Sequence, residues 1–137
     1  MIPFLYNTCY GGFAFSKEFE EEFSKRFPEK KEFLQGWSDK KRYDTDVVAL
    51  WKEMGEKANG SHSKINVKMV PENCVDFIHI REYDGMENVV IDWTFVYTSI
   101  CHRLVEAVKN RHDIAITNIL HEYDEIKDTY REYSSSK

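Results

Sequence analysis

The chain has 137 residues, a net charge of −5 and 20 aromatic side chains, made up of nine Phe, eight Tyr and three Trp. This length fits one domain and excludes a multidomain enzyme, and the aromatic content excludes a wholly disordered chain. No apolar run approaches the roughly 20 residues of a membrane span, and we expect no signal peptide because residues 1–12 lack a basic leader.

The first elements predicted are a strand and a helix. Residues 2–10 read as a strand, and Gly11-Gly12 ends it. Ser16 is a typical N-cap, and phenylalanines recur every four residues up to Phe27, which precedes a proline. Acidic residues in the first turns and basic residues in the last turn suit the helix dipole, so this segment is predicted to be helical.

A loop and a second helix are predicted next. Residues 28–43 contain a glycine and no clean hydrophobic period, which predicts a loop with a short helical turn at 29–34. Asp44 can cap a helix that runs to about residue 58, because the apolar residues there recur at spacings of three and four. Asn59-Gly60 is typical of the turn that would end this helix.

The middle of the chain predicts β-strands. Apolar and polar residues alternate from Ile65 to Met69, and two further strands are predicted at 75–82 and 88–93. Asp84-Gly85, between the last two, strongly favours a hairpin turn. With residues 2–10, this gives three or four antiparallel strands.

From Thr94 onward the hydrophobic period is helical, and Asp113 can cap a last helix. On that helix, apolar and tyrosine residues follow a heptad spacing over roughly two and a half repeats. Tyrosine is enriched where an apolar surface meets another chain and water, so we expect a homodimer contact here. The expected dimer interface consists of Ile116, Ile119, Tyr123, Ile126, Tyr130 and Tyr133.

This order of elements predicts an α+β fold, because strands and helices occur in separate runs. We expect a short antiparallel sheet of three to four strands, two helices before the β-meander and a C-terminal helical pair. Residues 1–137 are expected to form a single domain, in which 1–93 is the α+β core and 94–137 is the helical pair and dimerisation arm.

Cys9 is the residue most typical of an enzyme. A thiol beside Gly11-Gly12 could act as a nucleophile next to backbone N–H groups, with His79 or His102 as its base. The alternative is a small hydrophobic residue at the end of a strand. The three cysteines are widely spaced and form no Cys-x-x-Cys pair, so we expect reduced thiols and no zinc site.

Glu82, Asp84 and Glu87 form an acidic cluster at the predicted hairpin. Three carboxylates within six residues could hold Mg²⁺ or Ca²⁺. The simpler interpretation is a solvated turn. An enzyme built on Cys9 or on this cluster is therefore an alternative hypothesis, and our leading expectation includes no metal and no cofactor.

Residues 24–43 carry seven basic and three acidic residues, a local charge of +4 in an acidic chain. Aromatic residues are interleaved with these charges, and such a segment can hold phosphate and stack bases, so nucleic-acid binding through the basic loop 25–43 is a second alternative. The residues expected to contact a partner are Lys30, Lys31, Trp37, Lys40, Lys41 and Arg42.

Two blocks of the sequence resemble a family of small, uncharacterised proteins of large double-stranded DNA viruses, in the version carried by marseilleviruses. The blocks are Tyr6-Asn7-Thr8-Cys9-Tyr10-Gly11-Gly12-Phe13 and Glu82-Tyr83-Asp84-Gly85-Met86-Glu87. The resemblance extends over about residues 4–90 and leaves out the helices from Thr94. Neither block is a known catalytic signature, so the resemblance assigns no catalytic residues. It implies a virus-encoded protein in the host cytoplasm, virus factory or nucleus, with packaging in the virion as a further expectation.

The sequence as a whole therefore favours a non-enzymatic, virus-encoded interaction protein that forms a homodimer. We expect it to act on a host or viral partner and to have no membrane contact.

Overall fold

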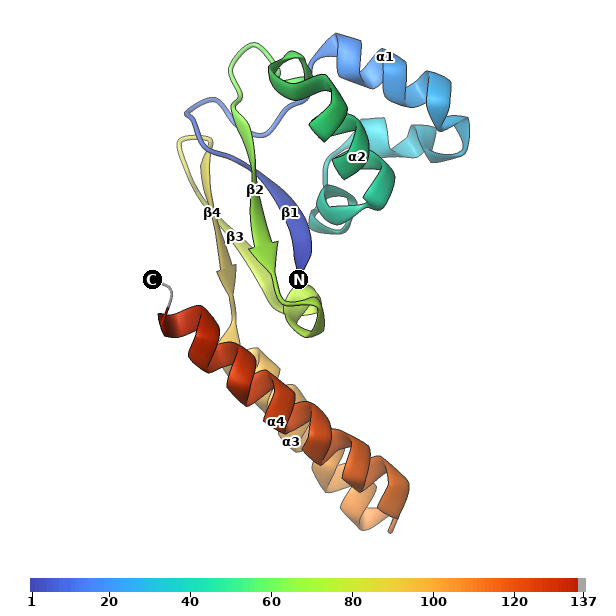
Figure 1. Cartoon of the computed structure of the whole chain (residues 1–137), viewed down its shortest axis with the longest axis vertical. Helices are drawn as coiled ribbons and strands as arrows, with labels where there is room; N and C mark the ends of the chain where they lie inside the picture. The colour runs from blue at the N-terminus through green and yellow to red at the C-terminus, as the bar shows by residue number, and fades with distance from the viewer. Residues whose placement is uncertain (136–137) are drawn as a thin grey trace. The chain divides into compact units, whose positions relative to one another are not determined.

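The computed structural model describes residues 1–135 (Figure 1). These residues form two compact units, which are described separately. The first unit comprises residues 1–72 and 78–90, and contains both sheets and the first two α-helices. The second comprises residues 73–77 and the chain from residue 91, and contains the two C-terminal helices. The structure confirms the expected α+β class, with helices before the later strands and a C-terminal helical pair.

The four strands form two antiparallel pairs. Strand β1 (Ile2–Asn7) pairs with β2 (Ile65–Val70), and β3 (Ile78–Tyr83) pairs with β4 (Met86–Ile91). The single sheet and the three-stranded meander expected from the sequence are therefore incorrect in this detail. The neighbour of β2 is the distant β1, and the 3₁₀ helix η4 (Glu72–Phe77) interrupts the chain between β2 and β3.

The helices of the first unit begin at the residues predicted to cap them. The Ser16 hydroxyl accepts the Phe19 N–H at 3.1 Å at the start of α1 (Lys17–Arg26). The Asp44 carboxylate accepts the Asp46 N–H at 3.0 Å at the start of α2 (Thr45–Met54). Between the two, the predicted loop contains more helix than expected. It forms the 3₁₀ helices η1 (Pro28–Gln35) and η2 (Asp39–Tyr43), and the short η3 (Gly55–Ala58) follows α2.

The phenylalanine stripe of α1 lies in the core of the first unit. Phe19 and Phe23 have no exposed surface, and their rings stack with centroids 6.0 Å apart. The main cluster of fully or largely buried side chains around this stripe comprises Leu5, Phe15, Phe19, Phe23, Val47, Val48, Leu50, Ala58 and Ile65. Burial of these side chains, rather than helix propensity, stabilises helices as short as α1 and α2.

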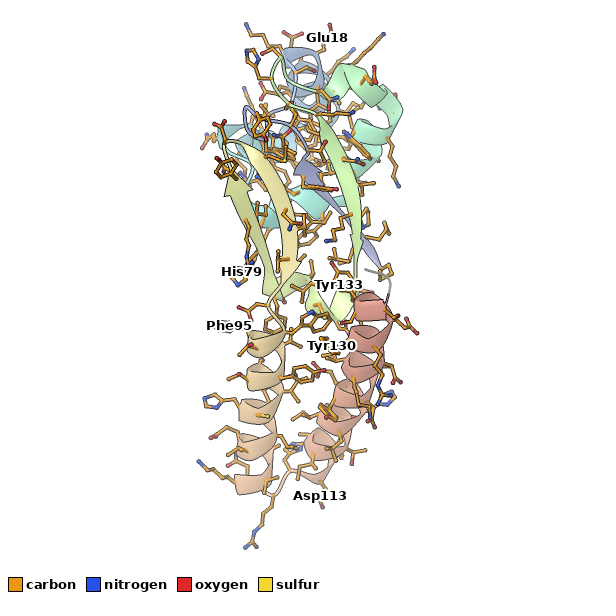
Figure 2. The ribbon with its side chains drawn as sticks, turned by 90° about the vertical axis from the view of Figure 1, so that its left-hand side faces the viewer. Glu18, His79, Phe95, Asp113, Tyr130 and Tyr133 are labelled. Carbon is orange, nitrogen blue, oxygen red and sulfur yellow. The ribbon has the colours of Figure 1, made fainter. Side chains whose placement is uncertain are left out.

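The second unit is built on an antiparallel helical hairpin of α3 (Trp93–Lys109) and α4 (Asp113–Ser135). Asp92 caps α3, because its carboxylate accepts the Phe95 N–H at 3.1 Å. Trp93 at the start of α3 contacts the ring of Tyr130 near the end of α4, with centroids 5.0 Å apart. The two helices therefore run in opposite directions along one another, as Figure 2 also shows.

Candidate functional site

The two sequence blocks meet at one place in the first unit. The Gly11 N–H donates to the Asp84 carbonyl at 3.2 Å, which joins the loop after β1 to the turn between β3 and β4. Gly85 lies so close to the backbone of Gly11 and Gly12 that a Cβ atom there would overlap it. Both Asp84 and Gly85 have positive φ, at 49° and 84°, as the tight turn of a hairpin requires. We call this region the junction.

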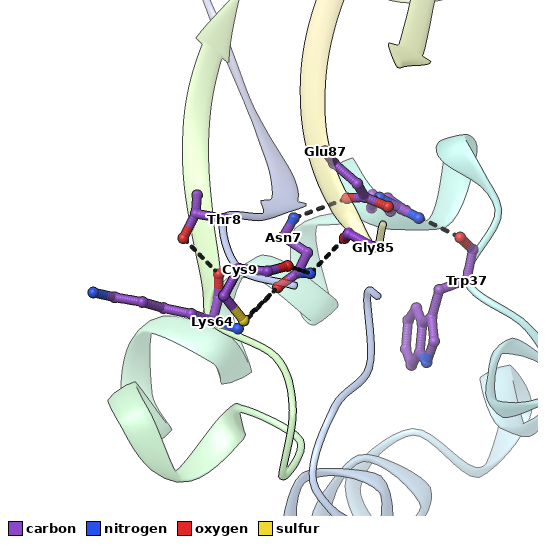
Figure 3. Close-up of polar contacts among 8 residues, drawn as sticks. Asn7, Thr8, Cys9, Trp37, Lys64, Gly85 and Glu87 are labelled. Atoms are coloured by element: carbon purple, nitrogen blue, oxygen red, sulfur yellow. Dashed lines mark hydrogen bonds and ion pairs between the residues drawn. The ribbon is translucent and has the colours of Figure 1, made fainter. Parts of the chain in front are cut away.

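Asn7, at the end of β1, is the centre of the junction (Figure 3). Its side chain is fully buried and donates to the carbonyls of Cys9 and Gly85 at 2.6 and 2.7 Å. Its amide oxygen accepts the Lys64 N–H at 2.9 Å. One asparagine thus connects the two sequence blocks to the segment before β2, so these contacts hold the junction together.

A buried ion pair lies beside Asn7. Arg42 Nη1 is 2.6 Å from Glu87 Oε2, and the same oxygen accepts the Asn7 backbone N–H at 2.8 Å. The Arg42 Nε donates to the Trp37 carbonyl at 3.0 Å, and the guanidinium lies 4.0 Å from the centre of the Phe13 ring. In residues 1–135, no buried side-chain nitrogen or oxygen lacks a hydrogen-bond partner. These charges are therefore paired with one another inside the protein.

The surroundings of Cys9 differ from those of a catalytic thiol. Cys9 is half-buried, and its Sγ lies within hydrogen-bond distance of two acceptors, the His62 carbonyl at 3.3 Å and the Asn7 amide oxygen at 3.6 Å, which compete for its one S–H proton. Neither oxygen can take a proton from the thiol as a general base would. His79 and His102, considered as bases, belong to β3 and α3 respectively.

The acidic cluster of the hairpin does not converge on one point. Glu82 and Asp84 are exposed, whereas Glu87 points inward and pairs with Arg42. Within residues 1–135, no group of three or more His, Cys, Asp or Glu side chains could hold a metal ion. The three carboxylates are therefore separated into two on the surface and one in the interior.

Three of the cations expected to contact a partner make bonds within the first unit. Lys30 Nζ pairs with Asp44 at 2.8 Å and Asp46 at 2.7 Å, and Lys41 Nζ donates to the Gly36 carbonyl at 2.7 Å. Burial lowers the pKa of Lys30, but its bonds to Asp44 and Asp46 outweigh this effect and raise the pKa overall. The third cation is the buried Arg42. Lys30, Lys41 and Arg42 thus fix the ends of η1, η2 and α2.

Trp37, expected to contact a partner, packs on the core. Its ring is half-buried and contacts the rings of five phenylalanines, with the Phe15 centroid closest at 4.6 Å. The phenylalanines are Phe13, Phe15, Phe19, Phe23 and Phe33. Because Phe33 and Trp37 pack into this cluster, they do not form an exposed platform for bases of the kind that single-stranded nucleic acids require.

Of the six residues expected to contact a partner, Lys31 and Lys40 are exposed. Lys31 lines an open groove of about 640 Å³ between α1 and η1. Lys17 and Lys25 also line this groove, together with the carboxylates of Glu20 and Glu21. The groove therefore carries both signs of charge, which does not favour phosphate over other ligands.

The heptad seam of α4 packs against α3 of the same chain. Ile119 and Ile126 are buried, and the Tyr123 ring lies 6.2 Å from that of Tyr97. Figure 2 shows Tyr130 and Tyr133 on the side of α4 that faces α3, where both rings contact Trp93. Ile116 is half-buried. The seam expected at a dimer interface thus lies mainly in the contact between the two helices of the hairpin, with Ile116 and the 39%-exposed Tyr123 at its edge.

Burial changes the acidity of two groups in the second unit. It raises the pKa of the Cys74 thiol, in η4, to about 11. It also raises the pKa of the Tyr97 phenol, with smaller contributions from Tyr123 and Tyr130. Both groups therefore favour their neutral forms in the folded protein.

Sequence reasoning missed the junction, although every residue type in it was visible. The sequence predicts a solvated turn at Glu87 and a partner-binding loop at Arg42, whereas the two side chains pair with one another. No sequence pattern indicates a role for Asn7. The glycines in the two blocks are the feature that could have predicted the junction, because glycines at two distant positions can mark a close approach of two backbones.

Comparison of the chain with known protein families, curated proteins and solved structures finds no match. Within residues 1–135, no helix combines the length and apolar character needed to cross a membrane.

Proposed function

We propose that this chain is a non-enzymatic, virus-encoded interaction protein that works as a homodimer. The virus and its setting in host cytoplasm, virus factory or nucleus, with packaging in the virion, come from the resemblance of the two sequence blocks. A binding role rather than a catalytic one is supported by the junction, where Asn7 and Arg42 both bond to Glu87 and these polar groups are used in holding the backbone.

The observation that carries the homodimer is the exposed apolar surface of the α3–α4 hairpin. The apolar residues of α3 and α4 that face each other are buried between the two helices. Outside that contact, Val105, Val108 and Leu120 remain 50%, 55% and 47% exposed. A hairpin of two helices buries only the surface between them. A four-helix bundle, made of two such hairpins, buries a further side of each helix in its core. Pairing of two hairpins would remove this apolar surface from water.

Light scattering on the purified full chain at micromolar concentration tests the proposal. We expect a mass of twice 16.3 kDa. A mass of 16.3 kDa across the micromolar range would contradict the homodimer. Hydrolase and nucleic-acid-binding assays on the same sample are expected to give no activity and no salt-dependent binding, and a positive result in either would replace the proposed role.

A further inference from the structure

We infer that the homodimer forms through one particular side of the α3–α4 hairpin, and that its occupant is the same side of a second copy. This inference rests on the proposed homodimer and specifies its surface. We call this surface the apolar side. It is defined by Cys101, Val105, Val108, Ile116, Leu120 and Tyr123.

Helical spacing brings these residues together on each helix. Cys101, Val105 and Val108 are separated by four and three positions on α3, and Ile116, Leu120 and Tyr123 by four and three positions on α4. Residues at such spacings share one side of an α-helix. Each helix therefore has, next to the stripe that faces its neighbour, a second apolar stripe.

The contacts between the helices show that both stripes lie on the same side of the hairpin. The Tyr97 and Tyr123 rings, 6.2 Å apart, close one side of the helix–helix contact. Arg103 and Glu122 close the opposite side through two parallel hydrogen bonds of 2.8 and 2.7 Å. At 3.6 residues per turn, the apolar stripe of each helix lies around the helix axis next to the tyrosine pair and away from the ion pair.

The two sides of the hairpin differ in charge. The side with the ion pair carries Arg103, Glu106, Glu122 and Glu125, and is suited to water. On α3, the apolar side carries no charged residue from Tyr97 to Val108, because Arg103 and Glu106 lie on the other side. On α4, the apolar side carries charges such as Lys127, which pairs with Asp124. An apolar centre with a polar rim is the usual composition of a protein–protein interface.

The size of the apolar side suits a second copy. Two adjacent helices over the 17-residue length of α3 present a flat area of about 25 by 20 Å, or roughly 500 Å² before side-chain relief is counted. Counted on both copies this is roughly 1,000 Å² in total, which is the lower limit for a specific protein–protein interface. Because its α3 stripe carries no charge and its α4 charges are of both signs, as in the Lys127–Asp124 pair, two copies can face each other across a two-fold axis without a uniform like-charge repulsion.

Protection of Cys101 tests which side is buried. The rate of Cys101 modification by a maleimide is measured in the full chain at concentrations above and below the dimer transition. We expect at least a tenfold slower modification in the dimer, and no concentration dependence for Cys9, which lies in the first unit. A dimer in which Cys101 reacts as fast as in the monomer would refute the apolar side while leaving the homodimer intact.

Paired substitutions provide the second readout. Val105→Glu and Leu120→Glu place a charge on the apolar side, and each is expected to raise the dimer dissociation constant at least tenfold. Phe95→Glu is the matched control, because Phe95 is 63% exposed and points away from α4 (Figure 2). Equal effects of all three variants, or none from Val105→Glu and Leu120→Glu, would refute the inference. Circular dichroism confirms that each variant is folded.

A monomer at all concentrations would refute both the homodimer and its surface.

Discussion

Arg42 and Glu87 lie 45 positions apart in the sequence and form a buried ion pair, with 2.6 Å between Arg42 Nη1 and Glu87 Oε2. Their side chains are 9% and 4% exposed. The pair joins the 3₁₀ helix η2 to strand β4, and Asn7 links it to strand β1. A contact among three distant segments requires the native fold, so its removal measures how much the junction contributes to stability.

Glu87→Gln is expected to lower the free energy of unfolding by about 3 kcal/mol, because it leaves the Arg42 guanidinium buried without its counter-charge. Urea denaturation measures this change. Glu82→Gln, at an exposed position near the same turn, is the matched control and is expected to change stability by less than about 0.5 kcal/mol. Equal effects of the two variants would show that the ion pair does not stabilise the junction.

Gly85→Ala is expected to destabilise the first unit by about 3 kcal/mol, since a Cβ atom would both strain a positive φ and overlap the backbone of Gly11 and Gly12. Gly36→Ala is the control, because no atom lies within 4 Å of the Cβ position there. Thermal unfolding of both variants measures the difference. If Gly85→Ala unfolds at the same temperature as the wild type, the close approach of the two blocks does not contribute to stability.

Local features of the fold could be predicted from the sequence, and pairing between distant segments could not. Ser16 and Asp44 cap their helices through bonds to residues two or three positions away, so their identity is sufficient to predict the helix start. The pairing of β1 with β2 joins residues more than 50 positions apart, as in Asn7 opposite Ile65. Strand alternation shows that a face is buried but does not identify the neighbouring strand.

The candidate site was harder to predict for the same reason. A charge count assigns Arg42 to a basic surface, because it sums neighbours along the chain. Burial of Arg42 depends on Glu87 and on the Phe13 ring, which come from other segments. The sequence likewise predicts a loop at Trp37 with its side chain available to a partner, although the ring packs into the phenylalanine cluster. Composition identified the unusual residues, and tertiary contacts decided which of them are exposed.

Trp37→Ala tests whether this residue belongs to the core or to a partner surface. It is expected to lower the free energy of unfolding by about 3 kcal/mol, because the indole ring packs on five phenylalanine rings. The Lys31→Glu/Lys40→Glu double variant changes two exposed positions of the same segment and is expected to unfold like the wild type. Chemical denaturation with tryptophan fluorescence compares the two. An unaltered stability in Trp37→Ala would return this residue to the list of partner contacts.

Cys9 is expected to react with a thiol reagent more slowly in the folded protein than in urea. Its side chain is half-buried there, and its thiol has two hydrogen-bond acceptors within reach. The measurement is made in the Cys101→Ser variant, so that the exposed Cys101 thiol does not contribute to the reaction. Cys74 has no exposed surface, and provides the internal reference for a thiol that reacts only after unfolding. A Cys9 that reacts faster folded than unfolded would support the nucleophile hypothesis.

Cys74 is expected to make the second unit sensitive to alkaline pH. Burial raises its pKa from 9.0 to about 11, so the folded state favours the neutral thiol. Its contribution is fully present below pH 9 and is lost as the pH rises toward 11, because the unfolded thiol ionises first. Between pH 8 and 10.5, with a reductant present, this loss is about 2 kcal/mol. Cys74→Ala retains the alkaline titration of the tyrosines and lacks that of the thiol, so the wild type should lose more stability than the variant over this range. Equal losses in the two proteins would mean that the Cys74 thiol ionises as readily in the folded state as in the unfolded one.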